Sequence, residues 1–197
     1  MPYEIQKVTK RSAARQEIDT AIELMFTGGS LVATNLLAWA AVDILRGIAV
    51  SAGKTTIRSI TEDYIKPEYL NEWRGIERES YNFFKHSDRD PTDEISFRPE
   101  ATAIVLFYAV ADYGGVYAQC TMPMYLFKAW FMSRYPSFFK GKTARQIESF
   151  QKALQFHEGQ SFSEALILAS DVYRDWKENR ELFVAQIPAG FMHNVEL

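Results

Sequence analysis

Residues 31–50 read LVATNLLAWAAVDILRGIAV and form the most hydrophobic stretch of the chain. The stretch approaches the length of a membrane span, but four polar residues interrupt it: Thr34, Asn35, Asp43 and Arg46. Ser30 can cap the N-terminus of a helix, and Gly53 suits its C-terminal end. Asp43 and Arg46 are three residues apart, so they would share a face of that helix and could pair. We therefore expect a buried central helix here rather than a membrane span.

Apolar residues recur at helical spacing on both sides of this stretch. Leu70, Trp73 and Ile76 are expected to form the inner face of one helix, and Gly114-Gly115 to kink or end another. The expected helices cover residues 18–25, 67–86, 101–113, 121–135 and 143–156, and a last long one begins at residue 161 or 163 and extends through 176.

These segments predict an all-α fold. Residues 1–120 are expected to form an up-and-down helical bundle of about four helices, by the usual helix lengths. Residues 121–197 would be a C-terminal helical extension packed on that bundle, rather than an independent domain. The tail from Val184 contains Pro188 and Gly190 and is expected to be irregular.

Composition excludes several classes of protein. With 47% hydrophobic and 24% charged residues, the 197-residue chain has the composition of a folded globular protein and not of a disordered one. Its 22 basic and 25 acidic residues give a net charge of -3, which excludes a generally cationic nucleic-acid binder. The single cysteine, Cys120, excludes an internal disulfide and a thiolate metal cluster. We expect a bacterial cytoplasmic protein without a membrane anchor.

Two familiar site motifs are incomplete. Gly53-Lys54-Thr55 resembles the end of a phosphate-binding loop, but Ile48 stands where that loop needs glycine, and a helix precedes it instead of a strand. None of the three histidines follows a glutamate at the Glu-x-x-His spacing of di-iron bundles. We therefore expect neither a cofactor nor a bound metal.

One polar stretch, RESYNFFKH at residues 78–86, differs from these patterns. Arg78, Asn82 and His86 are four residues apart, so on a helix they form a slanted polar stripe, with Lys85 beside it. His86 could move a proton of a phosphodiester, and Arg78 or Lys85 could stabilise negative charge on the phosphate. The candidate catalytic residues are His86, Asn82, Arg78 and Lys85. The alternative is structural: His86 ends the helix near its negative C-terminal dipole.

A helical hairpin with a glycine turn at Gly28-Gly29 resembles the opening of HEPN (higher eukaryotes and prokaryotes nucleotide-binding) domains. Its first arm contains residues 21–25, AIELM, and its second arm is rich in alanine over residues 33–45. Active members carry an Arg-Asn-x-x-x-His signature. Asn82 and His86 match it, but Tyr81 replaces the arginine, which argues against ribonuclease activity. The resemblance covers residues 12–118 and implies a homodimer with the third and fourth predicted helices facing the second subunit. The run at residues 82–91 is also similar to one in uncharacterised bacterial proteins.

The region after Cys120 combines aromatic and basic residues. The aromatic residues are expected to pack in the core: Phe127, Trp130, Phe131, Phe138 and Phe139. The basic residues would form a solvated face or contact RNA or an acidic protein: Lys128, Arg134, Lys140, Lys142 and Arg145.

The main hypothesis for function is a non-catalytic homodimer in a regulatory or stress-response setting. A second is a metal-independent endoribonuclease of HEPN type that uses His86. A third is a helical bundle that binds a small ligand or a metal with His86 and nearby carboxylates: Glu62, Asp63, Glu77 and Glu79.

Overall fold

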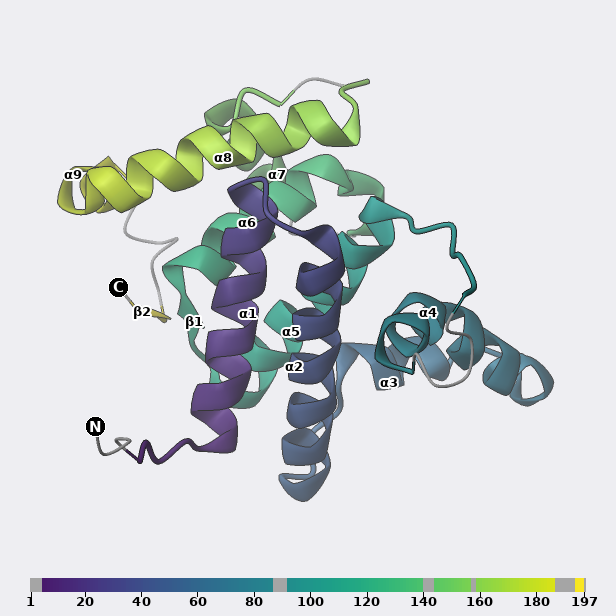
Figure 1. Cartoon of the computed structure of the whole chain (residues 1–197). Helices are drawn as coiled ribbons and strands as arrows, with labels where there is room; N and C mark the ends of the chain where they lie inside the picture. Colours follow the sequence, from purple (N-terminus) through teal and green to yellow (C-terminus); the bar gives the residue numbers. More distant parts are fainter. Residues whose placement is uncertain (1–4, 87–91, 140–143, 157–158, 187–193, 197) are drawn as a thin grey trace.

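The computed structural model describes residues 5–86, 92–139, 144–156, 159–186 and 194–196. Its elements are, in order, α1 (Lys10–Phe26), α2 (Leu31–Ser51), α3 (Ile57–Glu62), η1 (Pro67–Tyr69), α4 (Leu70–Lys85), α5 (Pro99–Tyr117), β1 (Cys120–Thr121), α6 (Met122–Arg134), η2 (Pro136–Phe138), α7 (Ala144–Ala153), α8 (Phe162–Glu178), α9 (Arg180–Gln186) and β2 (Val195–Glu196). Helices dominate this part of the chain (Figure 1). The predicted all-α class is confirmed.

The hairpin of α1 and α2 forms where the turn signals predict it. Gly28 adopts a left-handed φ of +74°, which favours glycine, and the Ser30 side chain accepts a hydrogen bond from the Ala33 N–H. The two helices then lie side by side and antiparallel (Figure 1). Gly53, at φ +63°, follows the end of α2 as expected.

α2 is central to the fold. It packs against α1 on one side and α5 on the other, and its Ala38, Trp39 and Leu45 are fully buried. By length and composition alone, α2 is also the one helix in the described ranges that could cross a membrane, a test that the core helix of a soluble protein passes too. Asp43 does not pair with Arg46 as expected; its partner is Arg78 of α4.

α5 continues through Gly114-Gly115 to Tyr117, so these glycines do not end it. The left-handed residue that ends the helix is Ala118, with φ 54°. Two backbone carbonyls near this end, those of Gly115 and Val116, accept hydrogen bonds from the Lys54 Nζ at 3.1 and 2.6 Å. A lysine thus provides the stabilisation that a C-terminal helix end favours.

The extension shares a hydrophobic core with the first half of the chain. The Phe26 ring of α1 lies 5.8 Å from the Trp130 ring of α6 and 5.8 Å from the Tyr173 ring of α8. Phe127, Trp130 and Phe131 are buried as predicted, but Phe138 is 60% exposed. Phe138 lies in the short helix after α6, where its ring stacks on Tyr135 at the surface.

The expectation of an irregular tail from Val184 is wrong in two places. α9 extends to Gln186, and β2 pairs in parallel with β1, joining Cys120 to Val195 and Thr121 to Glu196. Arg15 of α1 also binds the Glu196 carboxylate at 2.6 Å. The C-terminal residues thus pair with the segment that precedes α6.

α3 and α4 project from the side of the molecule (Figure 1). α4 contacts α2, but Tyr81 is the only one of its side chains that is buried. Ile76, expected on the inner face, is 67% exposed. The apolar stripe of α4 therefore faces outward over part of its length.

Candidate functional site

α4 and the residue that ends it carry all four candidate catalytic residues, from Arg78 at mid-helix to His86. Arg78, Asn82 and Lys85 belong to the helix, and His86 is the residue that ends it. The His86 backbone has left the helical conformation, with φ -119° and ψ 60°, while its N–H still donates to the Asn82 carbonyl at 3.0 Å. His86 is therefore held at the helix end by its backbone.

Arg78 holds α4 against α2 through its Nη2 group and the face of its guanidinium, whereas its Nε has no hydrogen-bond partner among the described residues. Its Nη2 lies 2.5 Å from the Asp43 carboxylate, and its guanidinium lies over the rings of Trp39 (4.7 Å) and Tyr81 (5.2 Å). A cation on aromatic faces with a carboxylate partner is a stable structural contact. Arg78 is thus not available to neutralise a substrate phosphate.

Lys85 is exposed, and its Nζ lies 5.3 Å from the centre of the Tyr81 ring. It shares this ring with Arg78. Neither cation lines the cavity that contains the other two candidate residues. The structure therefore divides the predicted stripe into an Arg78–Lys85 pair and an Asn82–His86 pair.

Asn82 and His86 line a cavity of about 310 Å³ between the end of α4 and the segment before α5. The remaining lining residues are Glu79, Phe83, Asp93, Glu94 and Ile95. Among the residues that the structure describes, three carboxylates and no lysine or arginine line this cavity, and their field repels a phosphodiester. The arrangement suits a cation or a hydrogen-bond donor better than the RNA that the nuclease hypothesis requires.

Two of the four carboxylates proposed as metal ligands, Glu62 and Glu77, are engaged elsewhere, whereas Glu79 lines the cavity with His86. Glu77 and Glu62 bind Arg58 at 2.7 and 3.6 Å, and Glu62 also binds Arg74. Among the described residues, no group of three or more histidine, cysteine, aspartate or glutamate side chains has the geometry of a metal site. Glu62 and Glu77 thus belong to an arginine network and do not approach His86 as a ligand set.

The sequence alone does not reveal Arg58, the residue at the centre of that network. Its side chain is 4% exposed, and its guanidinium lies 5.5 and 5.9 Å from the rings of Trp39 and Trp73. Burial raises the pKa of the Glu77 carboxyl, although Arg58 partly opposes the rise. No local pattern around Thr56-Ile57-Arg58 distinguishes this buried arginine from a surface one.

Asp112 of α5 is a second buried acid that the sequence does not reveal. One of its carboxylate oxygens accepts the Ile57 N–H at 2.6 Å, and the other has no hydrogen-bond partner. Burial raises the pKa of the carboxyl to about 6. The side chain fixes the first residue of α3 to α5.

Asp112→Asn is expected to remove part of the pH dependence of stability. Because the pKa of folded Asp112 exceeds the unfolded value, the acid's contribution to stability is complete below pH ~4 and is lost as pH rises through 6. In urea unfolding, the variant should be more stable than the wild type at pH 7.5. This advantage should shrink by about 1.5 kcal/mol at pH 5. An advantage that stays constant with pH would contradict the assignment.

Comparison with known proteins gives no matching family model, no matching curated protein and no matching solved structure.

Proposed function

We propose that this protein is a non-catalytic homodimer that associates through the exposed face of α3, η1 and α4. One observation carries the proposal: large apolar side chains are exposed together along this projecting part of the molecule. Tyr64, Tyr69 and Ile76 are 85%, 56% and 67% exposed, and Ile60 is 44% exposed. Contiguous exposed apolar side chains of this size mark interaction sites.

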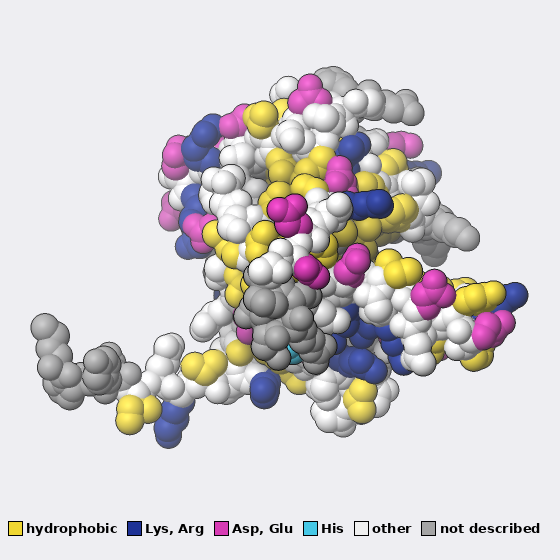
Figure 2. Space-filling model, turned by 45° about the vertical axis from the view of Figure 1, so that its right-hand side comes forward, with side chains coloured by type: hydrophobic (Ala, Val, Ile, Leu, Met, Phe, Trp, Pro, Cys, Tyr) yellow, Lys and Arg dark blue, Asp and Glu magenta, His cyan; other side chains and the backbone are white. Residues whose placement is uncertain are grey.

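This face, which we name the α4 face, has a shallow hollow as well as exposed apolar side chains. A shallow hollow of about 310 Å³ lies on it, lined by Tyr64, Ile65, Lys66, Tyr69, Glu72, Trp73 and Ile76. Figure 2 shows hydrophobic side chains on the projecting part of the molecule, interspersed with acidic and basic ones. Aromatic residues with an adjacent polar rim are typical of protein interfaces.

A second copy of the chain is the partner that fits this face. In a two-fold interface each surface patch contacts its own copy, so the patch must complement itself. The hollow carries one lysine and one glutamate, Lys66 and Glu72. Across a two-fold axis, Lys66 of each subunit can face Glu72 of the other, while the tyrosine and isoleucine side chains bury one another. The resemblance to HEPN domains implies the same helix at a dimer interface.

The non-catalytic part of the proposal is supported by the candidate residues themselves. Arg78 is bound to Asp43, and the cavity of Asn82 and His86 is lined with carboxylates. Neither Arg78 nor Lys85, the cations expected to stabilise a phosphate, lines the cavity of the histidine that would move the proton.

Ile76→Glu is expected to convert the dimer into a monomer. A two-fold interface contains each substituted side chain twice, so the dimer dissociation constant should rise on the order of 100-fold. Light scattering at micromolar concentrations should give the dimer mass for the wild type and the monomer mass for the variant.

Ile167→Glu is the matched control, because Ile167 of α8 is 62% exposed and lies outside the α4 face. It should remain dimeric. Both substitutions are at exposed positions, so each should change the free energy of unfolding by less than about 0.5 kcal/mol. A monomeric wild type would exclude the proposal, and a dimeric Ile76→Glu variant would exclude this interface.

A further inference from the structure

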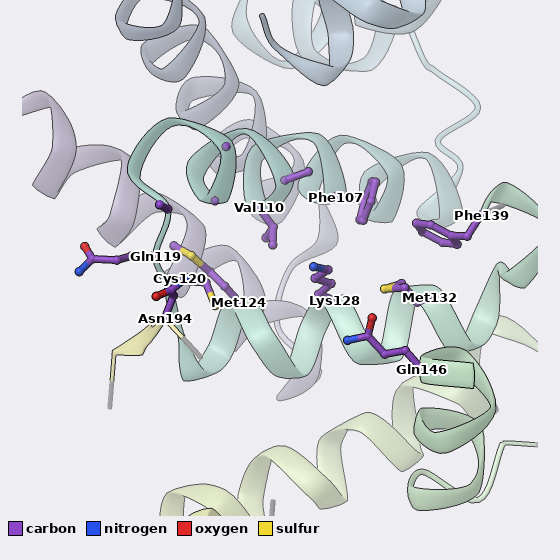
Figure 3. A pocket seen from close by; sticks show the side chains of 14 residues that line it. Phe107, Val110, Gln119, Cys120, Met124, Lys128, Met132, Phe139, Gln146 and Asn194 are labelled. Atoms are coloured by element: carbon purple, nitrogen blue, oxygen red, sulfur yellow. The ribbon is translucent and has the colours of Figure 1, made fainter. Parts of the chain in front are cut away.

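α5 and α6 enclose a groove that is separate from the α4 face and from the cavity of His86. Its volume is about 480 Å³, within the range of small-molecule sites. Most of its lining is apolar: Phe107 and Val110 come from α5, Met124 and Met132 from α6, and Phe139 follows the short helix after α6 (Figure 3). Methionine side chains adapt their shape to an apolar ligand.

Lys128 introduces a positive charge into this apolar lining. It is the one exposed residue in α6, and it lies one helical turn from both Met124 and Met132. In Figure 3 its side chain rises from α6 toward α5, into the groove. No salt bridge or hydrogen bond joins Lys128 to another described residue. The groove thus holds an unneutralised ammonium group among apolar side chains.

Gly114 and Gly115 leave the α5 wall of the groove open. Both residues line it, and a Cβ atom built on either would meet no atom within 4 Å. Glycine destabilises a helix by up to about 1 kcal/mol relative to alanine, and here neither close packing nor a left-handed turn requires it. What the two glycines provide in this structure is room along the α5 wall of the groove.

We propose that this groove binds a small amphipathic carboxylate, with an aliphatic or aromatic body and one anionic end. The carboxylate would bind the Lys128 Nζ, and the apolar body would lie against Met132, Phe107 and Phe139. The amide of Gln146 lines the groove as well and can donate a hydrogen bond to the carboxylate. A neutral apolar ligand would gain nothing from the Lys128 charge, and a cation would be repelled by it.

Isothermal titration of the full chain with decanoate, below its micellar concentration, tests the site. The wild type should bind one decanoate per chain. Lys128→Met keeps the length of the side chain without its charge, and should weaken decanoate binding roughly tenfold, the typical effect of losing a hydrogen bond to a charged group. The same variant should bind neutral 1-decanol at least as well as the wild type does. The control for Lys128→Met is Lys152→Met, which removes an exposed lysine of α7 outside the groove and should leave decanoate binding unchanged.

Gly114→Leu separates loss of binding from loss of folding. The leucine side chain would fill the groove, so decanoate affinity should fall at least tenfold. Because leucine favours helix more than glycine does, the melting temperature should stay equal or rise. Gly47→Leu, at an exposed glycine of α2 with equal space around it, should leave binding unchanged. Absence of saturable binding to the wild type would overturn the proposal, as would unchanged affinity in either Gly114→Leu or Lys128→Met.

Discussion

Arg58→Met is expected to lower the free energy of unfolding by about 3–5 kcal/mol, the typical cost of removing one partner of a buried ion pair. Arg58 is almost fully buried, and its Nε donates to Glu77 at 2.7 Å. Without the guanidinium, the Glu77 carboxylate would remain desolvated in a site where its second oxygen already lacks a partner. Urea unfolding at pH 7.5 measures the loss.

Two controls assign this loss to the buried charge. Arg74→Met removes an arginine that is 38% exposed and bound to Glu62, so it should lower stability by less than about 1 kcal/mol. The double variant Arg58→Met/Glu77→Gln should recover a large part of the loss, because no unpaired charge stays buried. If Arg58→Met behaves like Arg74→Met, then the buried Arg58–Glu77 pair does not stabilise the contact of α3 with α4.

Trp130→Ala is expected to destabilise the whole chain by about 3–5 kcal/mol, as large-to-small changes of buried tryptophan do. Trp130 is 1% exposed, its Nε1 donates to the Ala165 carbonyl at 2.9 Å, and its ring packs edge-on against Phe26 and Phe162. It therefore links α1, α6 and α8 through one side chain.

The way in which Trp130→Ala unfolds tests whether residues 121–197 depend on the rest of the chain. Unfolding followed by circular dichroism and by tryptophan fluorescence should give one coincident transition at a lower urea concentration. Phe138→Ala, at a 60% exposed ring, should change stability by less than about 1 kcal/mol. If Trp130→Ala instead unfolded only the helices of residues 121–197 early, while the rest of the chain kept the wild-type transition, the extension would be an independent unit.

The helix ends could be predicted from local chemistry. Ser30 and Gly28 act at the turn as their side chains and backbone freedom suggest, and Ser161 caps α8 with Glu164 in a reciprocal pair of hydrogen bonds. These contacts lie within three or four residues, so the sequence pattern contains them. Gly114-Gly115 shows the limit of such local signals. The glycine pair suggests a helix end, but the left-handed residue that ends α5 is Ala118.

The partners of charged residues could not be predicted, because they come from distant parts of the chain. Asp43 has Arg46 as a local candidate, yet its partner is Arg78, and α4 must first dock on α2 before that pair can form. Likewise, an apolar residue at helical spacing looks the same in a core and at an interface. Ile76 matched the core pattern and is exposed.

The candidate site was predicted in part. Each four-residue step turns an α-helix by about 40° past a full turn, so Arg78 and His86, two steps apart, differ by about 80° around the helix, with Asn82 between them. The structure accordingly places Asn82 and His86 in one cavity and leaves Arg78 outside it. The carboxylates that complete the cavity, Asp93 and Glu94, come from the segment before α5, which carries no signal of its position.

Hydrogen–deuterium exchange of the wild-type protein at two concentrations, one below and one above its dimer dissociation constant, tests whether two copies associate through the α4 face. Amide protection reports local burial, and the same chain is compared with itself. We expect amide protection to rise with concentration over residues 64–77 of the α4 face and to stay constant over α8. Protection that does not change over residues 64–77, or that rises elsewhere instead, would contradict this association.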